Sequence, residues 1–145
     1  MINRSALFGL VAGASIAVSA AAAFAVTPTN LDIDMWNKTD GSQGMTLETD
    51  HVSSGKVNFV VRNTSASELH ELLIVKTDLP LDQFADNADG TKIDETKLTG
   101  ITEVGDIKPG NTGNLTLDLT PGRYVLFCNQ EGHFHAGMHA ELIVN

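Results

Sequence analysis

The stretch Gly122-Arg-Tyr-Val-Leu-Phe-Cys128-Asn-Gln-Glu-Gly-His133-Phe-His-Ala-Gly-Met138 decides how this chain folds. Residues 124–127 form an unbroken run of aromatic, β-branched and aliphatic side chains, which is typical of a buried strand. The asparagine and the glycines that follow indicate a tight loop. Cys128 lies where the strand ends, and His133 and Met138 follow, each after four intervening residues. A thiol, an imidazole and a thioether are therefore placed in one short loop.

These three donors are soft enough to favour copper, and a copper site of this kind needs a second imidazole. His70 is the best candidate, because it precedes residues 71–77, a strongly apolar run that also predicts a strand. A histidine at the start of one strand can reach a cysteine at the end of its neighbour. The predicted metal ligands are therefore His70, Cys128, His133 and Met138.

The order His…Cys-x4-His-x4-Met resembles the type 1 (blue) copper site of the cupredoxins, the family of plastocyanin and azurin. Residues 56–63, with the short loop to His70, resemble the ligand-bearing hairpin of that family, and residues 119–128 resemble its Pro-Gly-x-Tyr strand before the copper cysteine. The resemblance implies one copper ion that alternates between Cu(I) and Cu(II). It also implies that the δ nitrogens of both histidines face the metal.

Strand patterns recur at short intervals with turn residues between them, which favours an all-β fold. We expect a cupredoxin-like, Greek-key β-sandwich of about seven to eight strands. The expected strands cover residues 31–36, 45–49, 56–63, 71–77, 101–107, 113–119, 123–128 and 140–144. Residues 78–100 interrupt the pattern and predict a long loop with a turn or two of helix, packed over the edge of the sandwich.

The expected strand before Cys128 has a defined inner face. Tyr124, Leu126 and Cys128 share one side of it by the two-residue period of a strand. If Cys128 points inward, Tyr124 needs a partner for its hydroxyl at the margin of the core, which resembles a tyrosine corner.

The remaining histidines compete with His133 for the role of ligand. If residues alternate around the loop, His135 points the opposite way from His133, and the resemblance also favours His133. His139 begins the last expected strand and is expected to be exposed, and His51, beside Asp50 and a Ser-Ser-Gly turn, is expected on the surface. A lone cysteine is often only a buried structural residue. Cys128 is the only cysteine of the chain, so no intramolecular disulfide can form.

Residues 1–25 are predicted to be a signal peptide. Arg4 supplies its positive charge, residues 6–23 its apolar body and Ala23-Phe24-Ala25 its cleavage site. An uncleaved membrane anchor is the alternative, because the apolar stretch is nearly long enough to span a bilayer. Residues 26–145 then form one copper-binding domain of 120 residues. The expected location is periplasmic or extracellular, after cleavage near Ala25.

The charge of the chain restricts its partners. Its formal net charge is −9, and removal of Arg4 with the signal peptide leaves −10. Such a surface repels nucleic acid and anionic membranes and attracts a basic partner at low ionic strength. We therefore expect a monomer whose mature chain does not insert into membranes. Its expected partners are redox proteins that carry a basic docking surface.

The expected function is electron transfer rather than catalysis, because side chains fill all the expected copper positions and nothing in the loop after Cys128 indicates a substrate pocket. By resemblance, electrons leave through His133 and an exposed, uncharged patch around Phe134, Ala136 and Gly137. Asn63 is expected to hold the His70 loop. Glu71 stands where cupredoxins usually carry an asparagine beside the first histidine.

Two other functions use the same residues. One is a periplasmic copper carrier or chaperone, in which His135 and His139 assist transfer of the metal to another exported protein. The other is a structural zinc site made by the same cysteine and histidines.

Overall fold

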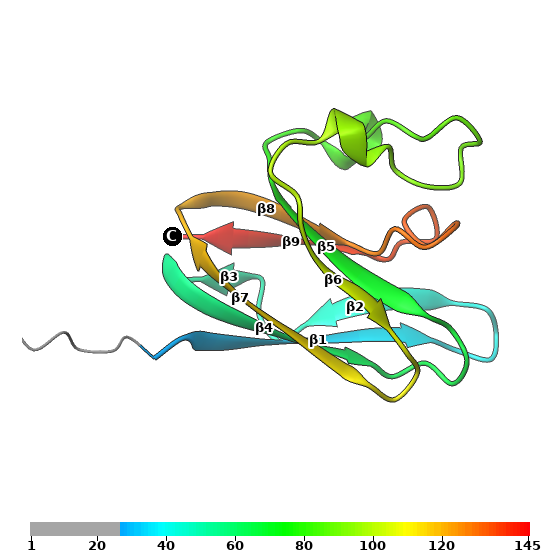
Figure 1. Cartoon of the computed structure of the whole chain (residues 1–145), viewed down its shortest axis with the longest axis horizontal. Helices are drawn as coiled ribbons and strands as arrows, with labels where there is room; N and C mark the ends of the chain where they lie inside the picture. Colours follow the sequence, from blue (N-terminus) through cyan, green and yellow to red (C-terminus); the bar gives the residue numbers. More distant parts are fainter. Residues whose placement is uncertain (1–26) are drawn as a thin grey trace, which may run out of the picture.

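The computed structural model describes residues 27–145, so the predicted signal peptide and its cleavage site lie outside the described residues. The regular secondary structure of this part of the chain consists of β-strands and two short 3-10 helices (Figure 1). It contains no helix long and apolar enough to cross a membrane. Its elements are β1 (Thr29–Asn37), β2 (Gln43–Leu47), β3 (His51–Val52), β4 (Gly55–Asn63), β5 (His70–Lys76), η1 (Leu81–Gln83), η2 (Glu95–Lys97), β6 (Thr102–Ile107), β7 (Thr112–Leu119), β8 (Gly122–Phe127) and β9 (His139–Val144).

The strands form two sheets, with the orders β2-β1-β4-β7 and β3-β9-β8-β5-β6. After β5 and β6 have paired in the second sheet, β7 returns to pair with β4 in the first, which is a Greek-key connection. The predicted all-β sandwich is confirmed. The strand missing from the prediction is β3, a two-residue strand beside β9 that is too short to show any periodicity.

The main core lies between the two sheets, where alternate residues of each strand meet. In β1, Leu31, Ile33 and Met35 are fully buried, while the intervening Asp32 and Asp34 face outward and pair with Arg62. This two-residue period is the pattern of a sheet with one wet face. The alternation of the first expected strand therefore identified its inner face correctly.

The five-stranded sheet is covered on both faces. Leu72 and Ile74 of β5 belong to the core between the sheets, whereas Leu73 and Val75 belong to a second cluster on the opposite face. A strand that is buried on both sides needs apolar residues at every position, so β5 and β8 read as continuous apolar runs.

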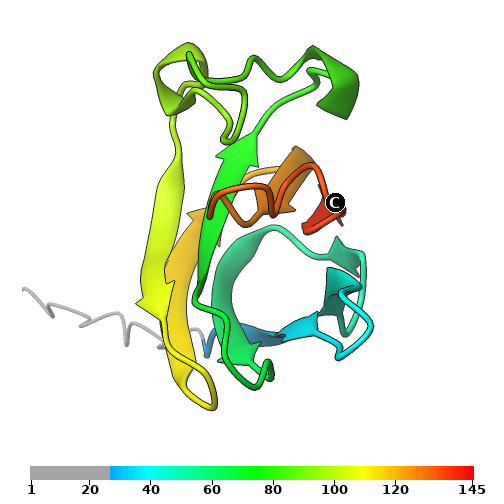
Figure 2. The same ribbon diagram turned by 90° about the vertical axis from the view of Figure 1, so that its right-hand side faces the viewer.

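The second cluster is covered by residues 77–101, which connect β5 to β6 and are called the strap here. Phe84 and Ile93 of the strap are buried against Val125 and Phe127 of β8. In Figures 1 and 2 the strap lies along one side of the sandwich, above β5 and β8. The two predicted turns of helix are η1 and η2. The strap covers the outer face of the sheet, so the expectation that it packs over an edge was wrong.

Tyr124 closes one end of the main core. Its hydroxyl donates to Thr120 O at 3.0 Å and accepts a hydrogen bond from Thr120 N at 3.1 Å. The ring itself is buried in the core between the sheets. The predicted tyrosine corner is confirmed.

Gly113 of β7 marks a close approach between the sheets and yields a prediction about stability. A β carbon at this position would overlap Val104 Cγ1 of β6 and would lie 3.2 Å from Ile107 Cδ1. We expect Gly113→Ala to lower the free energy of unfolding by about 1–3 kcal/mol, the usual effect of overpacking. Denaturant unfolding of the metal-free protein measures the change.

Gly105→Ala on β6 is the matched control, because a β carbon there meets nothing within 4 Å. Alanine is favoured over glycine inside a strand by roughly 0.5–1 kcal/mol, so this variant should keep or raise the stability. Equal effects at the two positions would contradict the proposed close approach.

Candidate metal centre

Strand pairing brings two of the predicted ligands to the same end of the five-stranded sheet. His70 is the first residue of β5, and Cys128 directly follows the last residue of β8. The two strands are antiparallel neighbours, with Leu73 opposite Phe127. The start of one strand and the end of the other therefore lie side by side, as the sequence predicted.

The loop after Cys128 is closed by its own backbone. Cys128 N donates to Met138 O, and Met138 N donates to His133 O, both at 3.0 Å. Gly132 and Gly137 have φ values of +76° and +94°, a left-handed conformation that glycine adopts without strain. Cys128, His133 and Met138 follow one another at intervals of five residues, and these bonds bring them next to one another.

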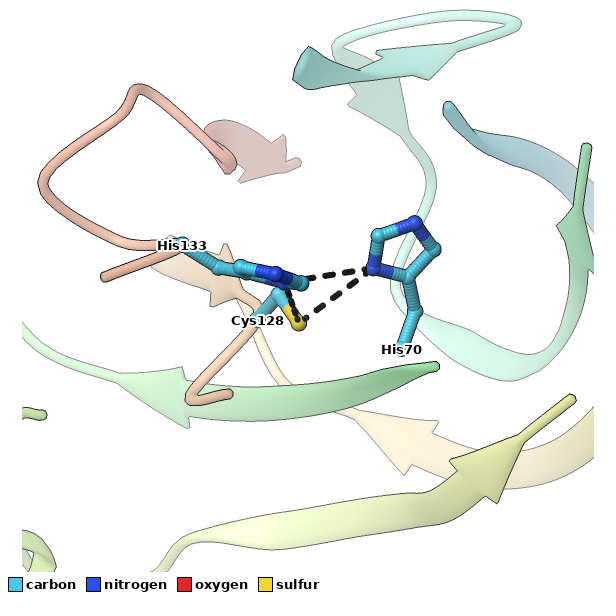
Figure 3. Close-up of side chains that lie close together, drawn as sticks. All are labelled: His70, Cys128 and His133. Atoms are coloured by element: carbon cyan, nitrogen blue, oxygen red, sulfur yellow. Dashed lines mark hydrogen bonds between the residues drawn. The ribbon is translucent and has the colours of Figure 1, made fainter. Parts of the chain in front are cut away.

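The side chains of His70, Cys128 and His133 converge on one point (Figure 3). The two Nδ1 atoms lie 3.3 Å apart, and Cys128 Sγ lies 3.3 Å from His133 Nδ1 and 3.8 Å from His70 Nδ1. The ring orientations agree with the expected use of the δ nitrogens. Met138 is fully buried in the same core cluster as Cys128. The role of each of the four side chains as a ligand stays a prediction.

Burial controls the protonation of these groups. It lowers the pKa of His70 to about 4, with a smaller contribution from His133, and it also lowers the pKa of His133. Burial raises the pKa of the Cys128 thiol to about 11, although the Glu71 N–H, 3.5 Å from Sγ, opposes this shift. At neutral pH both imidazoles are therefore uncharged and offer lone pairs.

This donor set fits copper. Two neutral imidazole nitrogens and a sulfur surround one point, and a soft cation bound there would replace the proton of the thiol. The desolvation that disfavours a bare thiolate is offset when a metal charge is present beside it. Both the geometry and the chemistry of these residues therefore fit a bound copper ion.

Asn63 fixes the segment that leads into His70. Its amide nitrogen donates to Glu68 O at 2.8 Å and to Ile107 O at 2.7 Å, and its oxygen accepts from Ser65 N at 3.0 Å. Asn63 is 1% exposed, so these bonds satisfy a buried amide completely. The predicted role of Asn63 in holding the His70 loop is confirmed.

The other histidines take different positions. His135 is exposed and its Nε2 lies 3.0 Å from Asp86 Oδ1 of the strap, away from the convergent group. His51 is exposed as expected and pairs with Asp50. His139 is half-buried beside Phe134, with ring centroids 5.1 Å apart, so the expectation that it is exposed was wrong.

His133 borders a surface hollow of about 290 Å³, which is also lined by Glu68, Leu69, Lys92, Gln130 and Glu131. Three of these side chains carry charge. Phe134 is buried and stacks on Phe84 of the strap at 5.8 Å, while Ala136 and Gly137 are exposed. The expectation that Phe134 is exposed was therefore wrong, whereas Ala136 and Gly137 are exposed as expected. Glu68 and Lys92 come from other loops, so the sequence around His133 did not reveal them.

Comparison with known structures agrees with this fold. A search of curated protein sequences gave no match. Solved structures that resemble the chain include sodium-dithionite-reduced auracyanin from Roseiflexus castenholzii, with 20% identity and a TM-score of 0.56 over 83% of this chain and 99% of that one. Auracyanin A from Chloroflexus aurantiacus gives 20% identity and a TM-score of 0.52 over 80% and 99%. Rusticyanin from Thiobacillus ferrooxidans gives 17% and 0.56 over 82% and 79%.

At these identities the structural likeness establishes a shared fold. The sequence itself is matched by a family model that is described as copper binding proteins of the plastocyanin/azurin family and covers residues 33–145. This range contains most of the chain, including His70, Cys128, His133 and Met138. The chain belongs to the plastocyanin/azurin family of copper-binding proteins.

Proposed function

We propose that the protein carries single electrons between redox partners, with copper held by His70, Cys128, His133 and Met138. The observation that carries this proposal is the convergence of two Nδ1 atoms and one Sγ within 4.8 Å of one another in a buried site. Copper, when bound, supplies the one-electron couple. A thiolate and two imidazoles with a weak axial thioether suit both of its oxidation states.

The residues around the site support this function by resisting rearrangement. His70 begins a strand that is hydrogen-bonded on both sides, to β6 and to β8. Cys128 and Met138 are joined through their backbones, and Asn63 fixes the approach to His70. A site that moves little between oxidation states exchanges electrons with a low reorganisation cost.

His133 is the proposed exit for electrons. His70 and Cys128 are 0% exposed, whereas His133 is 9% exposed and lines the charged hollow. A partner that docks over this hollow approaches the ring of His133 directly. The acidic balance of the chain favours a partner with a basic surface there.

The proposal includes export and a monomeric state. Residues 1–25 have the composition of a signal peptide, and the single cysteine is buried, which suits an oxidising compartment.

We assign no catalytic residues, since the expected copper positions are all supplied by side chains of the protein. Copper delivery is disfavoured because a carrier needs an accessible ion, whereas His70 and Cys128 are fully buried.

Electrochemistry of the copper-loaded protein tests the function. We expect a reversible one-electron reduction in which copper is retained, together with an intense visible absorption from thiolate-to-copper charge transfer. Loss of copper on reduction would support copper delivery instead. Absence of the absorption, with zinc in the purified protein, would support a structural zinc site.

Substitution of the sulfur donors gives a prediction with two different outcomes. Cys128→Ser should abolish the visible absorption, because a hydroxyl does not replace a thiolate donor to copper. Met138→Leu should keep the absorption and shift the reduction potential, because the axial thioether is a weak, long ligand. Absorption spectra and voltammetry check both variants. Complete loss of copper in Met138→Leu would show that the thioether is a primary ligand.

Charge reversal at the hollow tests the exit through His133. Glu131→Lys should slow oxidation of the reduced protein by a cationic reagent such as tris(phenanthroline)cobalt(III), because it removes attraction beside His133. The effect should shrink as added salt screens the charges. Glu48→Lys, an exposed position among residues that line a different hollow, is the control and should slow the reaction less. Equal effects would place the exit elsewhere.

The buried imidazoles make the stability of the metal-free protein depend on pH. The pKa of His70 is lowered from 6.5 to about 4 in the fold, so the unfolded chain binds protons first as the pH falls. The free energy of unfolding should therefore decrease as the pH falls from about 6.5 to about 4. Denaturant unfolding across this range measures the slope, and His70→Leu should reduce it. An equal slope in wild type and His70→Leu would contradict the prediction.

A further inference from the structure

Asn129, the residue directly after Cys128, is bonded to the strap through both ends of its amide. Its Oδ1 accepts from Ile93 N at 2.8 Å, and its Nδ2 donates to Ile93 O at 3.1 Å and to Glu95 Oε1 at 2.7 Å. The side chain is 2% exposed. A buried amide with donor and acceptor both satisfied has one stable orientation, because any rotation would leave polar groups unpaired.

These bonds fix the chain immediately beyond the cysteine. Cys128 N is held by Met138 O at 3.0 Å. Asn129, the next residue, is bonded to the strap. The backbone that carries the thiol therefore lies between two hydrogen-bonded anchors, one in the metal loop and one outside it.

The strap is itself firmly attached to the metal loop and to the sheet. Gly132 N donates to Thr91 O at 2.8 Å, and Phe84 stacks on Phe134 at 5.8 Å. Ile93, the main partner of Asn129, is 2% exposed within the second core cluster. In Figure 1 the strap leaves the end of β5 and passes over the loop that follows β8. An anchor in the strap is thus an anchor to the sheet.

The strap also connects the strand that carries His70 to the segment that carries Cys128. It follows β5, the strand that begins with His70, and it returns to the residue beside Cys128. Glu71 is the neighbour of His70. Among the hydrogen bonds of the described residues, its bond to Cys128 Sγ comes from the backbone N–H and not from the side chain. The amide side chain that links the residue beside Cys128 to the strap is that of Asn129.

We propose that Asn129 is a positioning residue, which holds Cys128 Sγ against the two imidazoles by way of the strap. The inference rests on the ligand role of Cys128 in the proposed function. Groups that orient a metal ligand typically change metal affinity 10- to 100-fold when they are removed. Asn129→Ala deletes all three bonds to the strap without changing charge, so its effect on the copper site reports positioning.

The test compares Asn129→Ala with Asn87→Ala, measured below the unfolding temperature of both. Asn87 is a matched control, because its Oδ1 accepts from Thr91 N and Lys92 N within the strap. Copper affinity is measured by competition with a chromophoric Cu(I) chelator, and the charge-transfer absorption by visible spectroscopy. Thermal unfolding of each metal-free variant measures the structural effect separately.

We expect Asn129→Ala to bind copper about 10- to 100-fold more weakly and to shift the charge-transfer band. Asn87→Ala should lower the unfolding temperature and leave both copper readouts unchanged. Glu95→Gln, which keeps an oxygen acceptor for Nδ2, should resemble the wild type. Glu95→Ala, which removes one bond of the three, should give a smaller shift than Asn129→Ala.

Unchanged affinity and absorption in Asn129→Ala, or equal changes in Asn87→Ala, would overturn the inference. Failure of the proposed electron-transfer function is recognised separately. In that case the wild type itself would bind copper but show no reversible reduction, while the comparison of Asn129→Ala with Asn87→Ala would still report on positioning.

Discussion

The antiparallel pairing of β5 with β8 is the contact on which the rest of the structure depends. It places the start of one strand beside the end of the other, so His70 and Cys128 meet at one end of the five-stranded sheet. Because the strands are central in that sheet, their backbone groups are paired on both sides and cannot shift by one residue without turning every buried side chain to the wrong face. The register that builds the core thereby also sets the distance between imidazole and thiol.

The sheet that carries the site is covered on both faces. On one face, Leu72, Leu126 and Cys128 pack into the main core. On the other face, Phe84 and Ile93 of the strap pack against the sheet. A connection of this length between neighbouring strands is far longer than an ordinary hairpin loop, and such loops usually have a role of their own. Here the strap buries apolar surface and at the same time reaches the metal loop through Asn129 and Thr91.

The electrostatics of the site follow from the same burial. Three polar groups are removed from water with few other partners, so each takes its uncharged form: two neutral imidazoles and a thiol. This arrangement is unfavourable for a protein that binds no cation and well suited to one that does. His133 differs from the other two by reaching a charged hollow at the surface, which is the route to a partner that we propose.

The sequence by itself determined the all-β sandwich, the inner faces of its strands and the candidate ligands, because strand periodicity and the spacing from Cys128 to Met138 are local properties. It also indicated Asn63 and Tyr124, each of which bonds to a residue four or five positions away, although Asn63 also reaches Ile107 of β6 in the other sheet. Only the tertiary structure decided the surroundings of His133, the burial of Phe134 and the contacts of Asn129. Glu68, Lys92 and Ile93 are distant in sequence, and no local pattern records which loops meet when the strap folds over the sheet.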